Sequence, residues 1–440
     1  MKAASIGLLG LLAAIPASAD EPFHVSVPVR KLAFTLLNLY GPNGLVVDSL
    51  ARLPSGATHS AHFNSDFQTG FTQFSTALTS QLASVPLPSP ASGLTYTYDS
   101  DLGVFQRSTQ SFGPILAERA ETIGRNRFSI GFSYQRLSFD NLEGFDLANL
   151  PAVFTHDSAE LRGGREDLVI TENAIEASVS QFTTFLTYGV SDRVDLSIAI
   201  PIVATDLNVV SSARVVRIGT TDEAVHFFRG ADGSMGTERV FDASGSATGL
   251  GDVTVRVKGT VSKKNGRDIA LGVDLRIPTG DEEDLLGSGA TGVKPFFVLS
   301  TSYKNVSPHV NVGYLWNGSS VLAGNLATGE TSDLPDQAHY AVGVDIGVNA
   351  RFTVAFDILG QWLIESPRVV RQEFRALNGQ SVFPNIGFET DTFNETNGAV
   401  GFKLNLGGNV LVDFNVLFKL NDNGLRDKVT PLFGFEYSFD

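Results

Sequence analysis

Apolar and polar side chains alternate with a period of two in twelve segments of the chain after residue 127. Successive side chains of a strand point to opposite faces, so each segment is expected to be a strand with one apolar face. Most segments cover about 9 to 11 residues, which is the length of a tilted strand that crosses a bilayer. They are residues 128–134, 182–190, 194–202, 253–261, 269–277, 293–303, 310–316, 340–348, 352–362, 400–406, 410–418 and 429–439.

The connections between these segments are alternately short and long. Short turns fall at residues 191–193, 262–267, 304–307, 349–351 and 407–408. Long connections fall at residues 140–173, 204–249, 279–292, 318–337, 364–397 and 421–429. This layout is typical of a transmembrane antiparallel up-and-down β-barrel, so an all-β barrel of about twelve strands is expected. A further hairpin at residues 94–98 and 104–107 would make fourteen strands, and this alternative stays open.

The polar face of the segments carries charges of both signs. Parity predicts that these side chains line the lumen, and the turn near Asn265 would place Asp274 opposite Arg256 or Lys258. Such pairs could simply satisfy a wet interior, or they could line a path for a solute. The mixture of signs argues against strong ion selectivity. The candidate lumen residues are Arg256, Lys258, Asp274, Arg276, Asp345, Asp357, Lys403 and Asp413.

The first residues form an export signal, with Lys2, an apolar run and Ala17-Ser18-Ala19. Residues 1–19 are therefore expected to be a signal peptide that is cleaved after Ala19. The chain has no cysteine and a net charge of −15, without a basic stripe, which excludes nucleic acid as a plausible partner. With 42% hydrophobic residues but no long apolar run, these features predict an exported protein of the bacterial outer membrane.

Residues 20–126 differ in composition and sequence pattern from the barrel expected at residues 127–440. A proline-rich linker covers residues 85–93, and the piece SFGPILAERAETIG favours a short helix near residues 111–123 that ends at Gly124. This N-terminal segment is expected either to plug the lumen or to lie in the periplasm.

No catalytic, cofactor or metal site is predicted. Only His309 and His339 lie on strands with lumen parity, near opposite ends of neighbouring strands, so no Ser-His-Asp group is expected. The pair His59 and His62 lacks a nearby carboxylate. The run DEED at residues 281–284 could hold divalent cations shared with lipopolysaccharide, although a solvated charge run explains it equally. Prolines at strand ends could kink the wall; they are Pro201, Pro278 and Pro295.

Three stretches carry a resemblance: TYGVSDRVDLSIAIP, GLGDVTVRVK and LRIPTGDEEDLLGSG, which begin at residues 187, 249 and 275. They resemble the outer-membrane family named for the MetA pathway of phenol degradation, which is related to channels for long-chain fatty acids and aromatic hydrocarbons. The final FGFEYSF also resembles the signature that the barrel assembly machinery recognises, although Asp440 follows it. The resemblance implies passive uptake of small hydrophobic or aromatic solutes, gated by an N-terminal plug.

Two other hypotheses stay open beside this channel. The first is a structural or anchoring barrel with a closed lumen, and the second is a barrel enzyme that acts on lipid. Outer-membrane lipid, lipopolysaccharide, the assembly machinery and a small hydrophobic solute are the partners expected for the channel.

Overall fold

A computed structural model describes residues 23–41, 44–52, 56, 95–99, 104–107, 111–155, 167–219, 221–264 and 266–439. The expected signal peptide, the linker at residues 85–93 and the pair His59 and His62 lie outside the described residues. Among the described residues, no helix has the length and hydrophobicity that a membrane crossing requires. The described helical structure is a single 3₁₀ turn, η1 (Leu32–Phe34).

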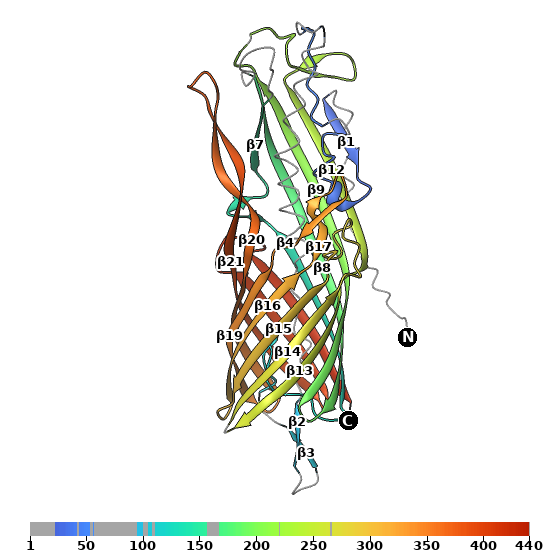
Figure 1. Cartoon of the computed structure of the whole chain (residues 1–440), viewed down its shortest axis with the longest axis vertical. Helices are drawn as coiled ribbons and strands as arrows, with labels where there is room; N and C mark the ends of the chain where they lie inside the picture. The colour runs from blue at the N-terminus through green and yellow to red at the C-terminus, as the bar shows by residue number, and fades with distance from the viewer. Residues whose placement is uncertain are drawn as a thin grey trace, which may run out of the picture.

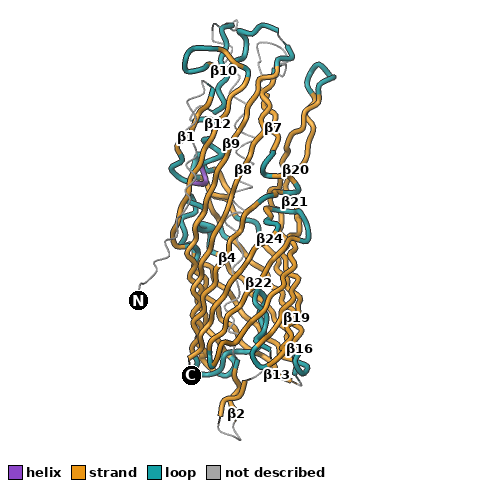
Figure 2. Tube along the Cα trace, turned by 180° about the vertical axis from the view of Figure 1, so that it is seen from behind, coloured by secondary structure: helices purple, strands orange, loops and turns teal. Residues whose placement is uncertain are grey.

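Twelve antiparallel strands form a closed barrel (Figures 1 and 2). Each strand pairs with the next in the ring, and the last, β24, pairs with the first, β4. The expected twelve-strand barrel is therefore confirmed. In ring order the strands are β4 (Phe128–Phe139), β8 (Leu168–Ser191), β9 (Val194–Val216), β13 (Val253–Lys264), β14 (Arg267–Ile277), β15 (Gly292–Thr301), β16 (Val306–Asn317), β19 (Gln337–Asn349), β20 (Phe352–Arg375), β21 (Val382–Gly407), β22 (Val410–Lys419) and β24 (Val429–Phe439).

The outward face of the barrel is a belt of exposed apolar side chains. Leu271, Ile358 and Phe433 are each about half exposed, at 51%, 52% and 52%. On β9 the belt runs from Val194 to Ile202 and gives way to the exposed Asp206. A soluble protein would not leave so large an apolar surface in water. The apolar face predicted from the sequence therefore faces lipid.

Several barrel strands continue well beyond the belt, at the end where the connections are long. Most of the described residues in the ranges 140–173, 204–249 and 364–397, which were predicted as loops, belong to strands. The prediction failed there because the pattern of the belt is lost: outward positions such as Asp206 are polar, whereas inward ones such as Leu207 and Val209 pack in a buried core. Other inward positions, such as Thr171 and Asn173, are polar and form hydrogen bonds. The added strands include β7 (Leu150–Thr155) beside β8 and β12 (Glu238–Leu250) beside β9. We call this region the outer extension.

Short strands also occur in the long connections. They are β5 (Asn141–Leu142), β6 (Phe145–Asp146), β10 (Phe228–Arg229), β11 (Met235–Gly236), β17 (Ser319–Asn325), β18 (Glu330–Asp333) and β23 (Leu425–Arg426). Among them, β23, β5 and β6 form a three-stranded sheet, and β10 with β11 and β17 with β18 form pairs.

The buried carboxylate of Asp167 stabilises the connection that follows β9 in the outer extension. Asp167 accepts hydrogen bonds from the backbone of Ile218 at 2.8 Å and Gly219 at 2.9 Å, and it contacts His226 Nδ1 at 2.6 Å. Burial raises the pKa of Asp167, but the hydrogen bonds from His226 and from the two backbone groups outweigh burial and leave this pKa below its ordinary value. The ionised carboxylate therefore stabilises this connection.

The described N-terminal residues pack against the outer extension. Strand β1 (His24–Pro28) runs parallel to β12, and Leu36 and Leu39 are buried in a core that includes Val209. Lys31 Nζ donates to Asp281 at 2.6 Å and to Asp284 at 2.8 Å. The acidic run at residues 281–284 thus binds a lysine, and no group of metal-ligating side chains is found within the described ranges.

Strands β2 (Tyr96–Asp99) and β3 (Val104–Arg107) form the hairpin that the sequence indicated, but it is a separate sheet. Figure 1 shows this hairpin beyond the short-turn end of the barrel, near the C-terminus. The alternative of fourteen barrel strands is therefore wrong, because the hairpin pairs only with itself.

Candidate functional site in the barrel lumen

Residues 111–124 cross the lumen near the short-turn end, and we call them the floor segment. The helix predicted near residues 111–123 is wrong, since this segment has no regular secondary structure. Its backbone groups bond to side chains of the wall, which take the place of helical hydrogen bonds. Phe112 N donates to Thr353 Oγ1 at 3.0 Å, and Ala120 N donates to Ser300 Oγ at 2.9 Å.

Asn311 and Asp195 extend this pattern of side-chain support along the segment. Glu118 N donates to Asn311 Oδ1 at 2.5 Å, and Asn311 Nδ2 donates back to Glu118 O at 2.9 Å. Ile123 N donates to Asp195 at 3.1 Å. A backbone group buried without a partner is unfavourable, so these wall side chains make an irregular segment stable inside the barrel.

Apolar contacts and a close backbone approach also hold the floor segment against the wall. Ile115 packs against Ala355 and Leu432. At the other end, Gly124 adopts φ of +97°, and a Cβ at Gly189 of β8 would lie 1.8 Å from its carbonyl oxygen. Only glycine allows this approach at position 189, so the barrel wall is shaped to receive the segment.

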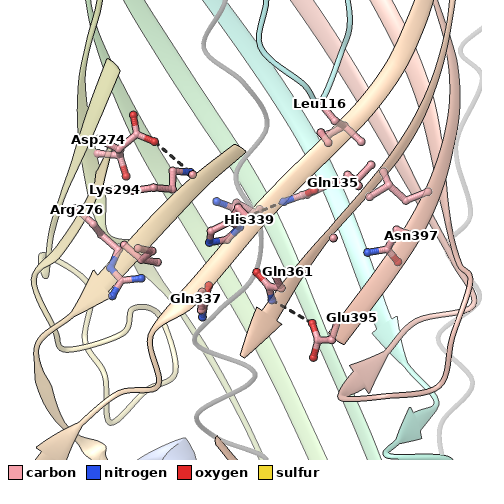
Figure 3. A pocket seen from close by; sticks show the side chains of 18 of the residues that line it. Leu116, Gln135, Asp274, Arg276, Lys294, Gln337, His339, Gln361, Glu395 and Asn397 are labelled. Atoms are coloured by element: carbon pink, nitrogen blue, oxygen red, sulfur yellow. Dashed lines mark hydrogen bonds and ion pairs between the residues drawn. The ribbon is translucent and has the colours of Figure 1, made fainter. Parts of the chain in front are cut away.

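A cavity of about 360 Å³ lies against the floor segment within the lumen. Leu116 and Glu118 of the floor line it, together with wall residues of both apolar and polar character. Figure 3 shows His339, Gln361 and Glu395 around this space, with Gln361 hydrogen-bonded to Glu395. The apolar lining includes Leu137, Val179, Ala199, Val203, Leu315, Leu359 and Leu363.

Charged side chains of the floor and wall form one chain of contacts beside the cavity. Glu118 accepts from Arg256 Nη1 and, at 3.2 Å, from Lys258 Nζ. Arg256 also donates to Asp274 at 2.5 and 2.7 Å, and Lys294 lies 3.1 Å from Asp274 (Figure 3). Three of the candidates from the sequence, Arg256, Lys258 and Asp274, thus meet at one place.

Asp345 and Asp357, two other candidates, meet at His309. His309 Nε2 lies 2.6 Å from Asp357 Oδ1, and Nδ1 lies 3.3 Å from Asp345 Oδ1, while Ser111 of the floor donates to Asp345. In these contacts the histidine faces two carboxylates, and the serine hydroxyl donates to one of them. A nucleophilic serine needs the histidine as its base, so this order of contacts does not make a catalytic triad.

The remaining candidates lie apart from these clusters. Arg276 donates to Asn317 Oδ1 at 2.7 Å and to Ala290 O at 3.3 Å. Lys403 and Asp413 lie directly opposite each other on β21 and β22. His339 lines the cavity, and its buried Nε2 has no hydrogen-bond partner among the described residues.

The three prolines lie at different kinds of position. Pro201 is in the middle of β9, between the part that pairs with β13 and the part that pairs with β12. Pro295 lies in β15, where the pairing with β16 skips residues 294 and 295, and Pro278 directly follows β14. A residue without an N–H is tolerated at such interruptions, and the role of these prolines in kinking the wall stays a prediction.

Sequence reasoning missed the floor residue Glu118 and its partner Asn311. Glu118 is nearly buried, and it stands within a short apolar stretch that also contains Arg119 and Glu121. Charges that recur among apolar residues were the available signal, since buried charges need partners. The sequence alone does not tell which strands supply those partners.

Together, the ring of strands, the lipid-facing belt and the occupied lumen define the class: a transmembrane β-barrel with a solute-sized cavity and an internal floor. The sequence profile of the family described as "Putative MetA-pathway of phenol degradation" matches residues 169–425. The chain belongs to this family, as the resemblance indicated. No curated protein matches the chain significantly.

Several solved structures share features of this fold. An outer-membrane channel from Pseudomonas putida F1 aligns with a TM-score of 0.44 and 11% identity, over 73% of this chain and 98% of that chain. The toluene transporter TbuX of Ralstonia pickettii aligns with a TM-score of 0.30 and 12% identity, over 73% of this chain and 92% of that chain. These similarities are low, and the fold rests on the strand pairing itself.

Proposed function

We propose that the protein is an outer-membrane channel for passive uptake of small hydrophobic or aromatic compounds, gated by its N-terminal floor segment. The observation that carries this proposal is the cavity of about 360 Å³, which lies inside a membrane barrel and whose lining exposes more apolar than polar surface. Cavities of this size suit molecules with one or two rings. The family description, which refers to phenol degradation, agrees with such a solute.

The orientation follows from the layout of barrels in the outer membrane, where short turns face the periplasm and long connections face outward. A solute then enters through the outer extension and reaches the cavity, where the floor segment blocks the direct path to the periplasm. Lipopolysaccharide around the outer extension and the barrel assembly machinery at the C-terminal strand are further proposed partners. Export by a cleaved signal peptide belongs to the same proposal.

Release past the floor requires that the segment moves as a unit. Its hydrogen bonds to Thr353, Asn311, Ser300 and Asp195 each contribute about 0.5–1.5 kcal/mol net, so thermal opening is rare unless something replaces these contacts. The closed lumen is therefore the resting state, and the solute or another trigger must shift it.

A disulfide lock tests the gate, because the chain has no native cysteine. Ala120→Cys and Ser300→Cys would place one thiol on the floor and one on β15, at positions joined by a hydrogen bond of 2.9 Å. Cells that produce the double variant should take up radiolabelled toluene only after a reductant opens the disulfide. The single variant Ala120→Cys is the control and should respond to neither oxidant nor reductant.

Uptake that persists in the oxidised double variant would show that solutes bypass the floor, and it would refute gating by this segment. The anchoring barrel is the second candidate, favoured by the extent of the outer extension and by the occupied lumen. It predicts equal toluene uptake with and without the protein, whatever the state of the disulfide.

A further inference from the structure

We propose that Glu118 occupies a carboxylate-binding site on the lumen wall, and that an apolar solute carrying a carboxylate displaces it and thereby loosens the floor. This inference rests on the proposed channel function, for which it names a solute class and a trigger. Two cations of the wall, Arg256 and Lys258, bind the Glu118 carboxylate of the floor.

The geometry of this contact resembles that of a bound anion. Arg256 Nη1 and Lys258 Nζ, from alternate positions of β13, both donate to the Glu118 carboxylate. Exposed fractions of these three side chains are small, at 8% for Glu118, 12% for Arg256 and 5% for Lys258. Ionised groups that are this buried bind strongly to a partner of opposite charge.

Charge balance makes Glu118 hard to remove without a substitute. Within the described part of the chain, the cluster joins Arg256, Lys258 and Lys294 to the carboxylates of Glu118 and Asp274. Asp195, directly opposite Lys258 on β9, brings the cluster to neutrality. If the floor withdraws Glu118, one buried cation is left without a counter-ion, which is strongly unfavourable. A different anion at this place removes that obstacle.

The cavity gives a solute access to Arg256, one of the two cations. Glu118 and Arg256 line the cavity, as do the apolar side chains of Leu116 and Phe296. The Arg256 guanidinium lies 4.8 Å from the centre of the Phe296 ring. A molecule could therefore place its carboxylate on Arg256 and its apolar body against Leu116 and Phe296, and Lys258, which does not line the cavity, would join the contact once Glu118 has left. A small aromatic or aliphatic carboxylate has this shape.

Benzoate and its neutral relative benzyl alcohol test the inference in planar bilayers that contain the full-length mature protein. Benzoate should raise the open fraction about tenfold, because a charge-assisted contact replaces that of Glu118, whereas benzyl alcohol should not. Glu118→Gln should open the channel without benzoate and lose the response. Glu330→Gln makes the same chemical change at an exposed position of β18, outside the floor segment, and should respond as the wild type does.

Equilibrium dialysis in detergent provides a second measurement that needs no transport. Glu118→Gln should bind benzoate about tenfold more tightly than the wild type does, since an internal competitor is gone, and Arg256→Gln should bind it more weakly. Folded protein is verified by its heat-modifiable migration in gels. Equal effects of benzoate and benzyl alcohol, or unchanged benzoate affinity in Glu118→Gln, would overturn the inference.

The two proposals fail in different ways. Toluene uptake by the wild type without any preference for benzoate would leave the channel standing and remove the carboxylate site. Absence of toluene uptake would count against the channel, while the binding difference between Glu118→Gln and the wild type would still decide the carboxylate site.

Discussion

Replacement of Gly189 by alanine is expected to unseat the floor segment. The new Cβ would lie 1.8 Å from the carbonyl oxygen of Gly124, whereas real Cβ contacts are essentially never closer than 3.0 Å. Two backbone hydrogen bonds also join this place to the residues that follow the floor segment: Asn126 N to Gly189 O at 2.8 Å, and Gly189 N to Arg127 O at 2.9 Å. The barrel ladder holds β8 on both sides, so the floor segment has to move.

The magnitude follows from these contacts. Overpacking costs about 1–3 kcal/mol, and each backbone hydrogen bond that is lost costs about 0.5–1.5 kcal/mol. The closed state should therefore lose at least ~2 kcal/mol, which raises the ratio of open to closed channels at least ~30-fold. Single-channel recording in planar bilayers measures this ratio.

Gly259→Ala is the matched control for this change. Its Cβ would meet Arg193 O at 3.7 Å, an ordinary contact, in the neighbouring part of the wall. If Gly189→Ala recorded the same open fraction as Gly259→Ala, the floor segment would not be seated against β8 as described.

Three further changes test other parts of the structure. Leu271→Arg places a charge on the lipid face, where it should cost about 2–4 kcal/mol in urea unfolding from vesicles, and an unchanged midpoint would contradict lipid contact. Asp167→Asn should expose residues 217–219 to protease at pH 7. In the wild type the lowered pKa of Asp167 means that its stabilisation is present above about pH 4, the unfolded value, and is lost as pH falls through the folded-state pKa. Equal protection of the wild type and Asp167→Asn at pH 7 would refute this role. Leu36→Ala should weaken docking of the N-terminal residues by about 2–5 kcal/mol, seen as faster tryptic cleavage at Lys31 than in the wild type.

The barrel itself could be predicted from the sequence because lipid imposes a simple rule. Every outward side chain within the belt meets hydrocarbon, so apolar residues recur at every second position, as they do from Val194 to Ile202. Above the belt, the outward positions of β9 meet water and the inward ones meet the N-terminal residues. The pattern of the belt is lost there, and strands were mistaken for loops.

The floor segment could not be predicted in the same way. Its apolar residues Ile115, Leu116 and Ile123 have a spacing that favours a helix, and the helix signals at Ser111 and Gly124 agree with it. In the folded barrel, partners from distant strands satisfy its backbone, and tertiary contacts override the local preference. Lumen parity did place Asp274 opposite either Arg256 or Lys258, because cross-strand pairing is a local property, and the register pairs Asp274 with Arg256. The anion between those cations, Glu118, belongs to the floor segment and not to a barrel strand. The alternating pattern of the strands therefore could not reveal it.

Quenching of tryptophan fluorescence by brominated lipids tests the central claim most directly. The chain has two tryptophans, Trp316 and Trp362, and both lie on the outward face with exposed fractions of 53% and 44%. If the outward face contacts lipid, bromine attached high on the acyl chains should quench most of the fluorescence, while aqueous iodide should quench little of it. Strong quenching by iodide with none by brominated lipid would contradict a lipid-facing barrel.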